Sequence, residues 1–216
     1  MTSTEAIRAQ FRAWILETDY PCVGAKAAFN SESDDVQVYS ALIDFTAELA
    51  HDLRSFAGTS QDREFATFVA IFRERIPGSE AEFEQQLWRQ LQMLHKLDGA
   101  EWDASVSSDP RDPHFSFSFA GQAFYVIGIH PHSSRFARQF PWPALVFNPH
   151  EQFERLRSDG KWKRMQQTIR ERDKQLQGNI NPMLSDFGER SEAAQYSGRK
   201  VGAEWEPPIG KCPFHR

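Results

Sequence analysis

Residues 115–130 read FSFSFAGQAFYVIGIH, and this stretch indicates the fold class. Phenylalanines at 115, 117 and 119 alternate with serines, which is the two-residue period of a β-strand. Ala120 and Gly121 suit a turn, and residues 123–129 are almost wholly apolar. The stretch therefore predicts a β-hairpin whose second strand ends at His130. A third short strand is expected over residues 144–147, after two prolines.

On the N-terminal side of the hairpin, apolar residues recur at helical spacing. The pattern predicts four helices, over about residues 3–18, 38–56, 65–76 and 79–94. Residues 20–27, between the first two, form a compact segment of small side chains. The helical part is thus expected to occupy about residues 1–97 and to present its apolar stripes to one shared core.

On the C-terminal side, helices are predicted over residues 150–157 and about 162–176. The last segment, 178–216, has no sustained period, but apolar and aromatic residues are spread through it, so we expect an ordered, loop-rich tail that wraps the protein. The predicted fold class is α+β: N-terminal helices packed on a small antiparallel sheet, then C-terminal helices and the tail. We expect one domain, 1–216, with the sheet and site loops at about 113–150.

Composition excludes several classes of protein. The chain has 216 residues with 30 acidic and 25 basic side chains, a net charge of −5, so its overall field would repel nucleic acid. It has no apolar run long enough for a membrane span and no signal-peptide pattern at its start, and the expected location is the cytoplasm. Two cysteines cannot form a disulfide framework. Aromatic residues make up 13% of the chain, which favours a pocket for a planar ligand.

The densest cluster of chemically active side chains is HPHSSRFARQF, residues 130–140. It follows the hairpin, and strand ends are common places for functional loops. If Ser134 caps a short helix, Arg135 and Arg138 share a face and could bind carboxylates or phosphates. A solvated basic turn is the alternative. One imidazole, such as His130, could bind haem iron, whereas zinc would need His130, His132 and His150 to converge.

Three further positions could contribute a ligand atom. His150 follows Asn148 and Pro149, which suit the start of a helix, and we interpret His150 as a surface residue of the first helical turn. Cys22 and Cys212 are each expected to be buried and inert by default. Alternatively, either thiol could be a reactive thiolate or a soft metal ligand.

The segment 176–201 is rich in directional hydrogen-bonding groups for a predicted loop. Such a segment could bind a polar, cationic substrate group; alternatively, it consists of turns and caps. Its candidate residues are Asn181, Asp186, Glu189, Glu192 and Tyr196.

Five strings in this order resemble the YqcI/YcgG family: YPCVGAKAAF (20–29), HPHSSRFARQF (130–140), LVFNPHEQFERLR (145–157), IRERDKQLQGNINPMLSDFGERSEAAQYSGR (169–199) and CPF (212–214). Members of that family include haem-dependent N-hydroxylases that act on the guanidino groups of arginine-like amino acids in the guanitoxin and D-cycloserine pathways. The resemblance implies a b-type haem, dioxygen, an electron donor and a small substrate with a guanidino or amino group.

The resemblance also suggests roles for the candidate residues. His130 is the first choice for the axial iron ligand, with His150, Cys22 and Cys212 as alternatives. Arg135 and Arg138, with Ser134 beside them, would hold the haem propionates. Asp186, Glu189 and Glu192 would face the guanidinium, and Tyr196 or Asn181 would orient bound oxygen.

Two other functions remain open at this point. A haem sensor or carrier would bind haem through the same residues without turnover, and a zinc hydrolase would use His130, His132 and His150. No membrane or nucleic-acid partner is expected, and a homodimer is possible.

Overall fold

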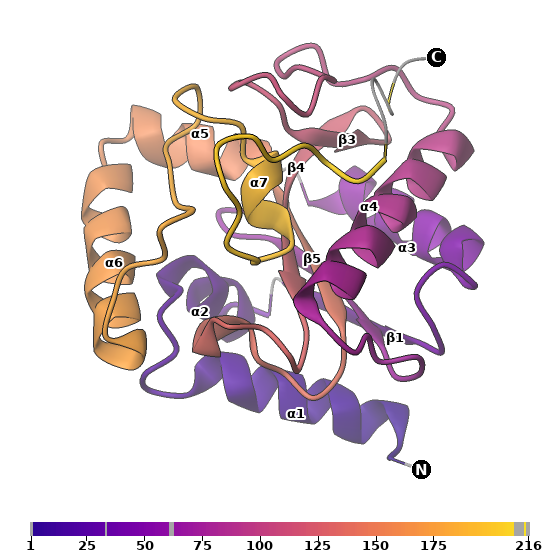
Figure 1. Ribbon diagram of the computed structural model, residues 1–216, viewed down its shortest axis with the longest axis horizontal. Coiled ribbons are helices and arrows are strands. Elements are labelled where there is room, and N and C mark those ends of the chain that lie inside the picture. The colour runs from indigo at the N-terminus through magenta and orange to yellow at the C-terminus, as the bar shows by residue number, and fades with distance from the viewer. Residues whose placement is uncertain (1, 33, 61–62, 210–213, 215–216) are drawn as a thin grey trace.

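The computed structural model describes residues 2–32, 34–60, 63–209 and 214, and it confirms the predicted α+β class. Helices surround a five-stranded sheet (Figure 1). The described helices are α1 (Thr4–Leu16), α2 (Val23–Asn30), α3 (Thr46–Thr59), α4 (Glu80–Leu97), α5 (His150–Ser158), α6 (Trp162–Gln177) and α7 (Ala193–Tyr196), with a 3₁₀ turn at Phe136–Arg138. The strands are β1 (Asp34–Tyr39), β2 (Thr67–Phe72), β3 (Phe117–Phe119), β4 (Gln122–Ile129) and β5 (Ala144–Pro149).

The sheet has the strand order β1-β2-β5-β4-β3. The predicted hairpin is β3–β4, in which Phe117 pairs with Phe124, and the predicted third strand is β5. The pairs β2–β5, β5–β4 and β4–β3 are antiparallel, whereas β1 pairs parallel to β2. The sheet is therefore mostly antiparallel, as predicted, and the parallel edge strand β1 makes it mixed.

Two segments predicted as helices contain strands. Residues 34–39 form β1, so the expected helix over 38–56 begins only at Thr46. Residues 67–72 form β2, a central strand in which every side chain is buried. Because both faces of β2 are covered, the five residues after Thr67 are all apolar and show no two-residue alternation. A short run of this kind fits a helical stripe equally well.

The other helices agree with their sequence signals. Ser79 caps α4, since its hydroxyl accepts from the backbone N–H of Glu82 at 3.2 Å. Helices α1, α5 and α6 lie where the periodicity predicts them. In contrast, α2 begins within the segment 20–27 and continues to Asn30, where no helix is predicted. None of the helices in the described part of the chain has the length and apolar character needed to cross a membrane.

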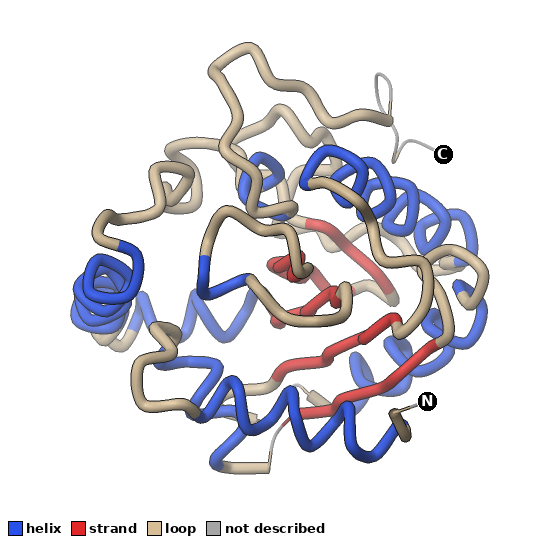
Figure 2. The backbone as a smooth tube through the Cα atoms, turned by 60° about the horizontal axis from the view of Figure 1, so that its bottom comes forward, coloured by secondary structure: helices blue, strands red, loops and turns tan. Residues whose placement is uncertain are grey.

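The two faces of the sheet carry separate cores, and Figure 2 shows the strands enclosed by helices and loops. Alternate residues of β2 point to opposite faces, so Phe68 packs in the core with α3 and α4, while Val69 packs in the core with α1 and α2. Helices α5 and α6 lie on the same side as α2, with which α6 is in contact.

The C-terminal tail is ordered over residues 178–209, as predicted. Its backbone is tied to the loop before the hairpin, where the Gly188 N–H donates to the Pro113 carbonyl at 3.1 Å. Further along, Ser197, Arg199 and Trp205 all donate to the buried carboxylate of Glu84 on α4. The tail thereby contacts both the loop before the hairpin and helix α4.

Candidate functional site

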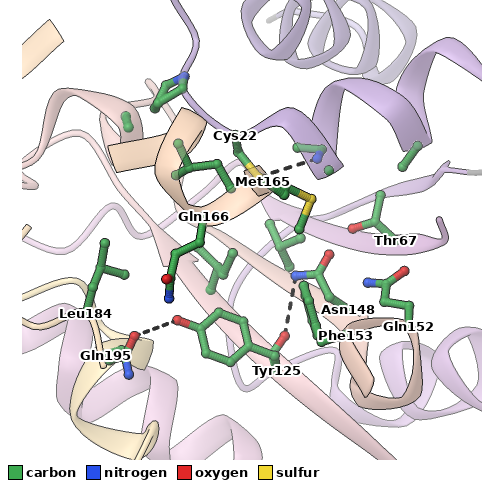
Figure 3. Close-up of a pocket in the computed structure, with 18 of the residues that line it drawn as sticks. Cys22, Thr67, Tyr125, Asn148, Gln152, Phe153, Met165, Gln166, Leu184 and Gln195 are labelled. Atoms are coloured by element: carbon green, nitrogen blue, oxygen red, sulfur yellow. Dashed lines mark hydrogen bonds between the residues drawn. The ribbon is translucent and has the colours of Figure 1, made fainter. Parts of the chain in front are cut away.

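A cavity of about 250 Å³ lies between one face of the sheet and the helices α1, α2, α5 and α6, with the tail across it. Its wall is mainly apolar and aromatic, which is usual for a site that holds a small organic ligand or cofactor. Figure 3 shows part of this wall. Its apolar members include Phe11, Ile15, Tyr20, Phe29, Phe65, Val69, Ile127, Ile129, Val146, Phe153, Trp162, Met165 and Ile169.

His150 lines this cavity and is buried, contrary to the prediction of a surface residue. Helix α5 begins at His150 with Pro149 at the N-cap position, so Asn148 does not cap it. The side-chain amide of Asn148 instead donates to the Tyr125 carbonyl at 3.4 Å. The imidazole packs on Phe187 of the tail, with 4.5 Å between the ring centres, and its Nε2 lies 3.3 Å from Glu154 Oε1. Burial lowers the pKa of His150, which favours the neutral imidazole that can bind a metal.

Cys22 also lines the cavity, at the start of α2. Its sulfur accepts a hydrogen bond from the Ala25 N–H at 3.4 Å and lies near Met165 (Figure 3). Burial raises the pKa of this thiol, so the free protein holds it as a thiol. Cys212, the other candidate thiol, lies outside the described residues.

His130 does not line the cavity. Side chains alternate along β4, so Ile129 faces the cavity and His130 points to the opposite face. There it is fully buried and stacks on Phe83 of α4 at 4.3 Å, and neither ring nitrogen has a hydrogen-bond partner among the described residues. Burial lowers its pKa to about 4.

The zinc alternative required His130, His132 and His150 to converge. No three His, Cys, Asp or Glu side chains within the described ranges are grouped so that they could hold a metal ion. His132 is exposed, while the other two histidines are buried in different surroundings. The described histidines therefore give no zinc site.

Arg135 and Arg138 both line the cavity, but each has partners within the protein. Arg135 donates to Asp173 at 2.6 Å and to the Asn179 side chain at 2.6 Å. Arg138 donates through Nη1 to the backbone carbonyls of Gln195 and Tyr196. Both side chains therefore fasten the tail to the sheet.

Ser134 does not cap a helix, so the arrangement considered for it does not form. The short turn after it is 3₁₀, begins at Phe136 and has no side-chain cap. Ser134 is exposed and is not part of the cavity wall. Its backbone N–H donates to Glu80 of α4 at 2.8 Å.

Among the three candidate carboxylates, Glu192 lines the cavity and is buried. Ser116 and Tyr196 both donate to its Oε1, at 2.8 Å and 2.6 Å. Burial raises the pKa of Glu192 to about 8, so the carboxyl is mostly protonated at neutral pH. Tyr196 is fully buried behind Glu192 and is not part of the cavity wall.

The remaining candidates of the tail lie at different depths. Asn181 is buried in the cavity wall, and its side-chain oxygen accepts from the Met183 N–H at 3.0 Å. Asp186 is half-buried outside the wall and accepts from Gln166. Glu189 is exposed. The structure thus brings Asn181 and Glu192 to the cavity wall and leaves Asp186 and Glu189 outside it.

The charged residues of the cavity wall are mostly basic. Among the described residues of the wall, arginines outnumber acidic side chains. The arginines are Arg135, Arg138, Arg157, Arg170 and Arg190, and the acidic residues are Asp173 and Glu192. Asp173 pairs with Arg135, and Arg157 pairs with Glu154, which lies outside the wall. Because Glu192 is mostly protonated, Arg138, Arg170 and Arg190 leave the wall with a net positive charge. Such a wall suits a ligand with an apolar body and negatively charged groups.

Several residues of the cavity wall are not among the candidates selected from the sequence. Thr67 of β2, Tyr125 of β4 and Asn148 of β5 lie on the cavity face, as does Gln152 of α5. Arg157 lies over the Trp162 ring at 4.9 Å. A signal for Tyr125 is present in the hairpin itself, because it shares the strand period of Ile127 and Ile129. Thr67 cannot be assigned to a face when β2 is predicted as a helix.

Comparison with known proteins agrees with the family resemblance of the five sequence strings. The family model of YqcI/YcgG matches residues 11–215. The chain belongs to the YqcI/YcgG family. Two members from Bacillus subtilis (strain 168) are similar to it: the uncharacterized protein YcgG, 29% identical over 211 residues, which cover 90% of this chain and 80% of that protein, and the uncharacterized protein YqcI, 28% identical over 214 residues, which cover 92% and 81%. No solved structure matches this member of the YqcI/YcgG family.

Proposed function

We propose that this protein is a haem-dependent N-hydroxylase that transfers oxygen to a guanidino or amino nitrogen of an arginine-like amino acid. The observation that supports the proposal is the cavity wall, which combines an apolar interior, arginine side chains and two potential iron ligands. A b-type haem has a planar apolar body, which suits the apolar interior, and two carboxylates, which suit the arginine side chains.

The residue types of the cavity wall suit the cofactor. His150 and Cys22 are the candidates for the axial ligand that line the cavity, and His150 is the first choice because burial favours its neutral form. Toward the described residues, the hydrogen bonds of Arg138 all come from Nη1, so its other nitrogens can hold a propionate. Arg170 of the cavity wall can hold one as well. When bound, haem supplies the activation of dioxygen.

The protein's own residues would place the substrate. Ser116 and Tyr196 both use Oε1 of Glu192, which fixes the carboxyl at the cavity wall. A guanidinium beside Glu192 would stabilise the carboxylate form, so we expect substrate binding to release a proton from this residue. Asn181 and the tail around it would exclude water from the site.

The overall reaction needs an external reductant. One oxygen atom of dioxygen forms the new N–O bond, and the N–H proton moves to that oxygen to give the N-hydroxyl group. The other oxygen atom leaves as water, which takes up two protons and two electrons. A separate electron donor must therefore supply those electrons, and we propose it as a partner of this protein.

The first experiment is the visible absorption spectrum of the full-length protein, produced with ample haem precursor, in ferric, ferrous and ferrous-carbonyl forms. We expect a Soret band, and the position of the carbonyl band distinguishes an imidazole ligand from a thiolate. A protein that is colourless and does not take up added haem would overturn the proposal.

Three substitutions then identify the ligand. His150→Ala is expected to change the spectrum and reduce haem content, whereas His130→Ala, a matched change on the opposite face, should alter neither. Cys22→Ala tests the thiolate alternative. Oxygen consumption that does not increase with any guanidino or amino substrate would favour a haem sensor or carrier over an enzyme.

A further inference from the structure

A row of polar side chains crosses the cavity face of the sheet. Tyr125 of β4 pairs with Asn148 of β5, and Thr67 of β2 stands beside Asn148, because the next residues along these strands, Phe68 and Phe147, are paired. The neighbouring residues on the same face are apolar, such as Val69 and Ile127. The row is therefore a local polar feature of an otherwise apolar floor.

Thr67 has an unused hydroxyl. Its side chain lines the cavity and is buried, yet Oγ1 has no hydrogen-bond partner among the described residues. A buried hydroxyl without a partner is destabilising, and such groups are rare in folded proteins. In Figure 3, Thr67 lies on the same side of the cavity as Asn148 and Gln152, across from Leu184 and Gln195. A ligand in the cavity can supply the missing hydrogen bond.

The two amides beside Thr67 have fixed orientations. Gln152 accepts the Ala66 N–H through Oε1 at 3.0 Å, so its Nε2 is the end that can donate to a ligand. Asn148 donates through Nδ2 to the Tyr125 carbonyl, so its Oδ1 is the end that can accept. The row thus offers a hydroxyl donor, an amide donor and a carbonyl acceptor.

We infer that Thr67, Asn148 and Gln152 form a subsite for the α-amino-acid head of the substrate. The Thr67 hydroxyl and Gln152 Nε2 donate to a carboxylate oxygen, and the ammonium group donates to Asn148 Oδ1. The positive field of the wall arginines favours the carboxylate. This inference rests on the proposed function, and it makes the head group, rather than the guanidino group alone, a determinant of specificity.

The test compares Thr67→Val with Thr67→Ser in the haem-loaded, full-length protein. Valine keeps the shape of threonine but removes the hydroxyl, whereas serine keeps it. Dissociation constants are measured by calorimetry for L-arginine and for agmatine, its decarboxylated form. We expect Thr67→Val to weaken L-arginine binding roughly tenfold, the effect of one hydrogen bond to a charged group. Binding of agmatine should change by less than about twofold, and Thr67→Ser should stay near wild type.

The ligand-free protein supplies a second readout that does not depend on activity. Because the hydroxyl is unpaired, Thr67→Val should raise the midpoint of thermal unfolding. Thr46 is a matched control, since its buried hydroxyl donates to the Ile43 carbonyl at 2.7 Å and accepts from Gln90. Thr46→Val should lower the midpoint and leave L-arginine affinity unchanged.

Two results would overturn the inference in different ways. In the first result, the wild type binds L-arginine and Thr67→Val either binds it equally well or loses as much affinity for agmatine as for L-arginine. The subsite is then wrong and the proposed function stands. If the haem-loaded wild type binds neither compound, the proposed function fails, and the inference fails with it.

Discussion

Arg135 and Asp173 form a buried ion pair, with 2.6 Å between Nη2 and Oδ2. Asp173 also accepts the backbone N–H of Asn181 at 2.8 Å, and Arg135 donates to Asn179. The pair therefore connects the loop after β4, helix α6 and the first part of the tail, all of which contribute to the cavity wall.

The first prediction concerns this ion pair. Asp173→Ala leaves the Arg135 guanidinium buried without its carboxylate, and we expect a loss of about 3–5 kcal/mol in the free energy of unfolding. Urea denaturation measures it. The exposed pair of Arg75 and Asp44, also at 2.6 Å, is the matched control, and Asp44→Ala should cost less than about 1 kcal/mol. Equal losses of unfolding free energy in the two variants would show that the buried pair stabilises the protein no more than the exposed pair.

For Arg135 and its neighbours, the sequence predicts some structural features and misses others. The strand pattern correctly predicts that the motif 130–140 follows a strand and carries two arginines in one loop. Their internal partners, Asp173 and the Gln195 carbonyl, are remote in sequence, and no local pattern reports such contacts. Spacing therefore indicates the loop but not what its arginines bind.

The histidines give the complementary case. The sequence correctly places the end of β4 next to His130, but the face to which His130 points depends on which residues of the strand face which helices. That choice cannot be made when β2 is predicted as a helix. The prediction that His150 is exposed rests on a helix cap at Asn148, and Phe187, which covers the imidazole, belongs to the distant tail.

The second prediction concerns Gly128 on β4. A Cβ atom at this position would lie 2.5 Å from Phe83 Cε1 and 2.8 Å from the Tyr196 carbonyl oxygen, both of which are in the core on the far face. We expect Gly128→Ala to lower the free energy of unfolding by about 1–3 kcal/mol, the usual cost of overpacking.

Gly202 provides the control for Gly128, since a Cβ atom there would meet none of the described residues within 4 Å. Gly202→Ala should leave the urea midpoint almost unchanged. A Gly128→Ala variant as stable as the wild type would mean that α4 and the tail can move away from β4, contrary to the packing described above.

The third prediction concerns the pH dependence of stability and Glu192. Burial raises the pKa of this carboxyl from 4.5 to about 8, so between these values the folded state holds a proton that the unfolded state releases. The stabilising contribution is complete below about pH 4.5 and is lost as the pH rises to about 8. The loss amounts to several kcal/mol, because each tenfold change in proton affinity between the two states corresponds to roughly 1.4 kcal/mol.

Glu192→Gln removes this titration while its amide oxygen can still accept from Ser116 and Tyr196. We therefore expect the stability of the variant, relative to wild type, to increase steadily between about pH 5 and pH 8 in urea unfolding. Glu189→Gln, an exposed change in the same loop, should instead give a curve parallel to wild type. If the Glu192→Gln curve were also parallel, Glu192 would be ionised in the folded protein, and a cationic substrate would meet a carboxylate that is already charged.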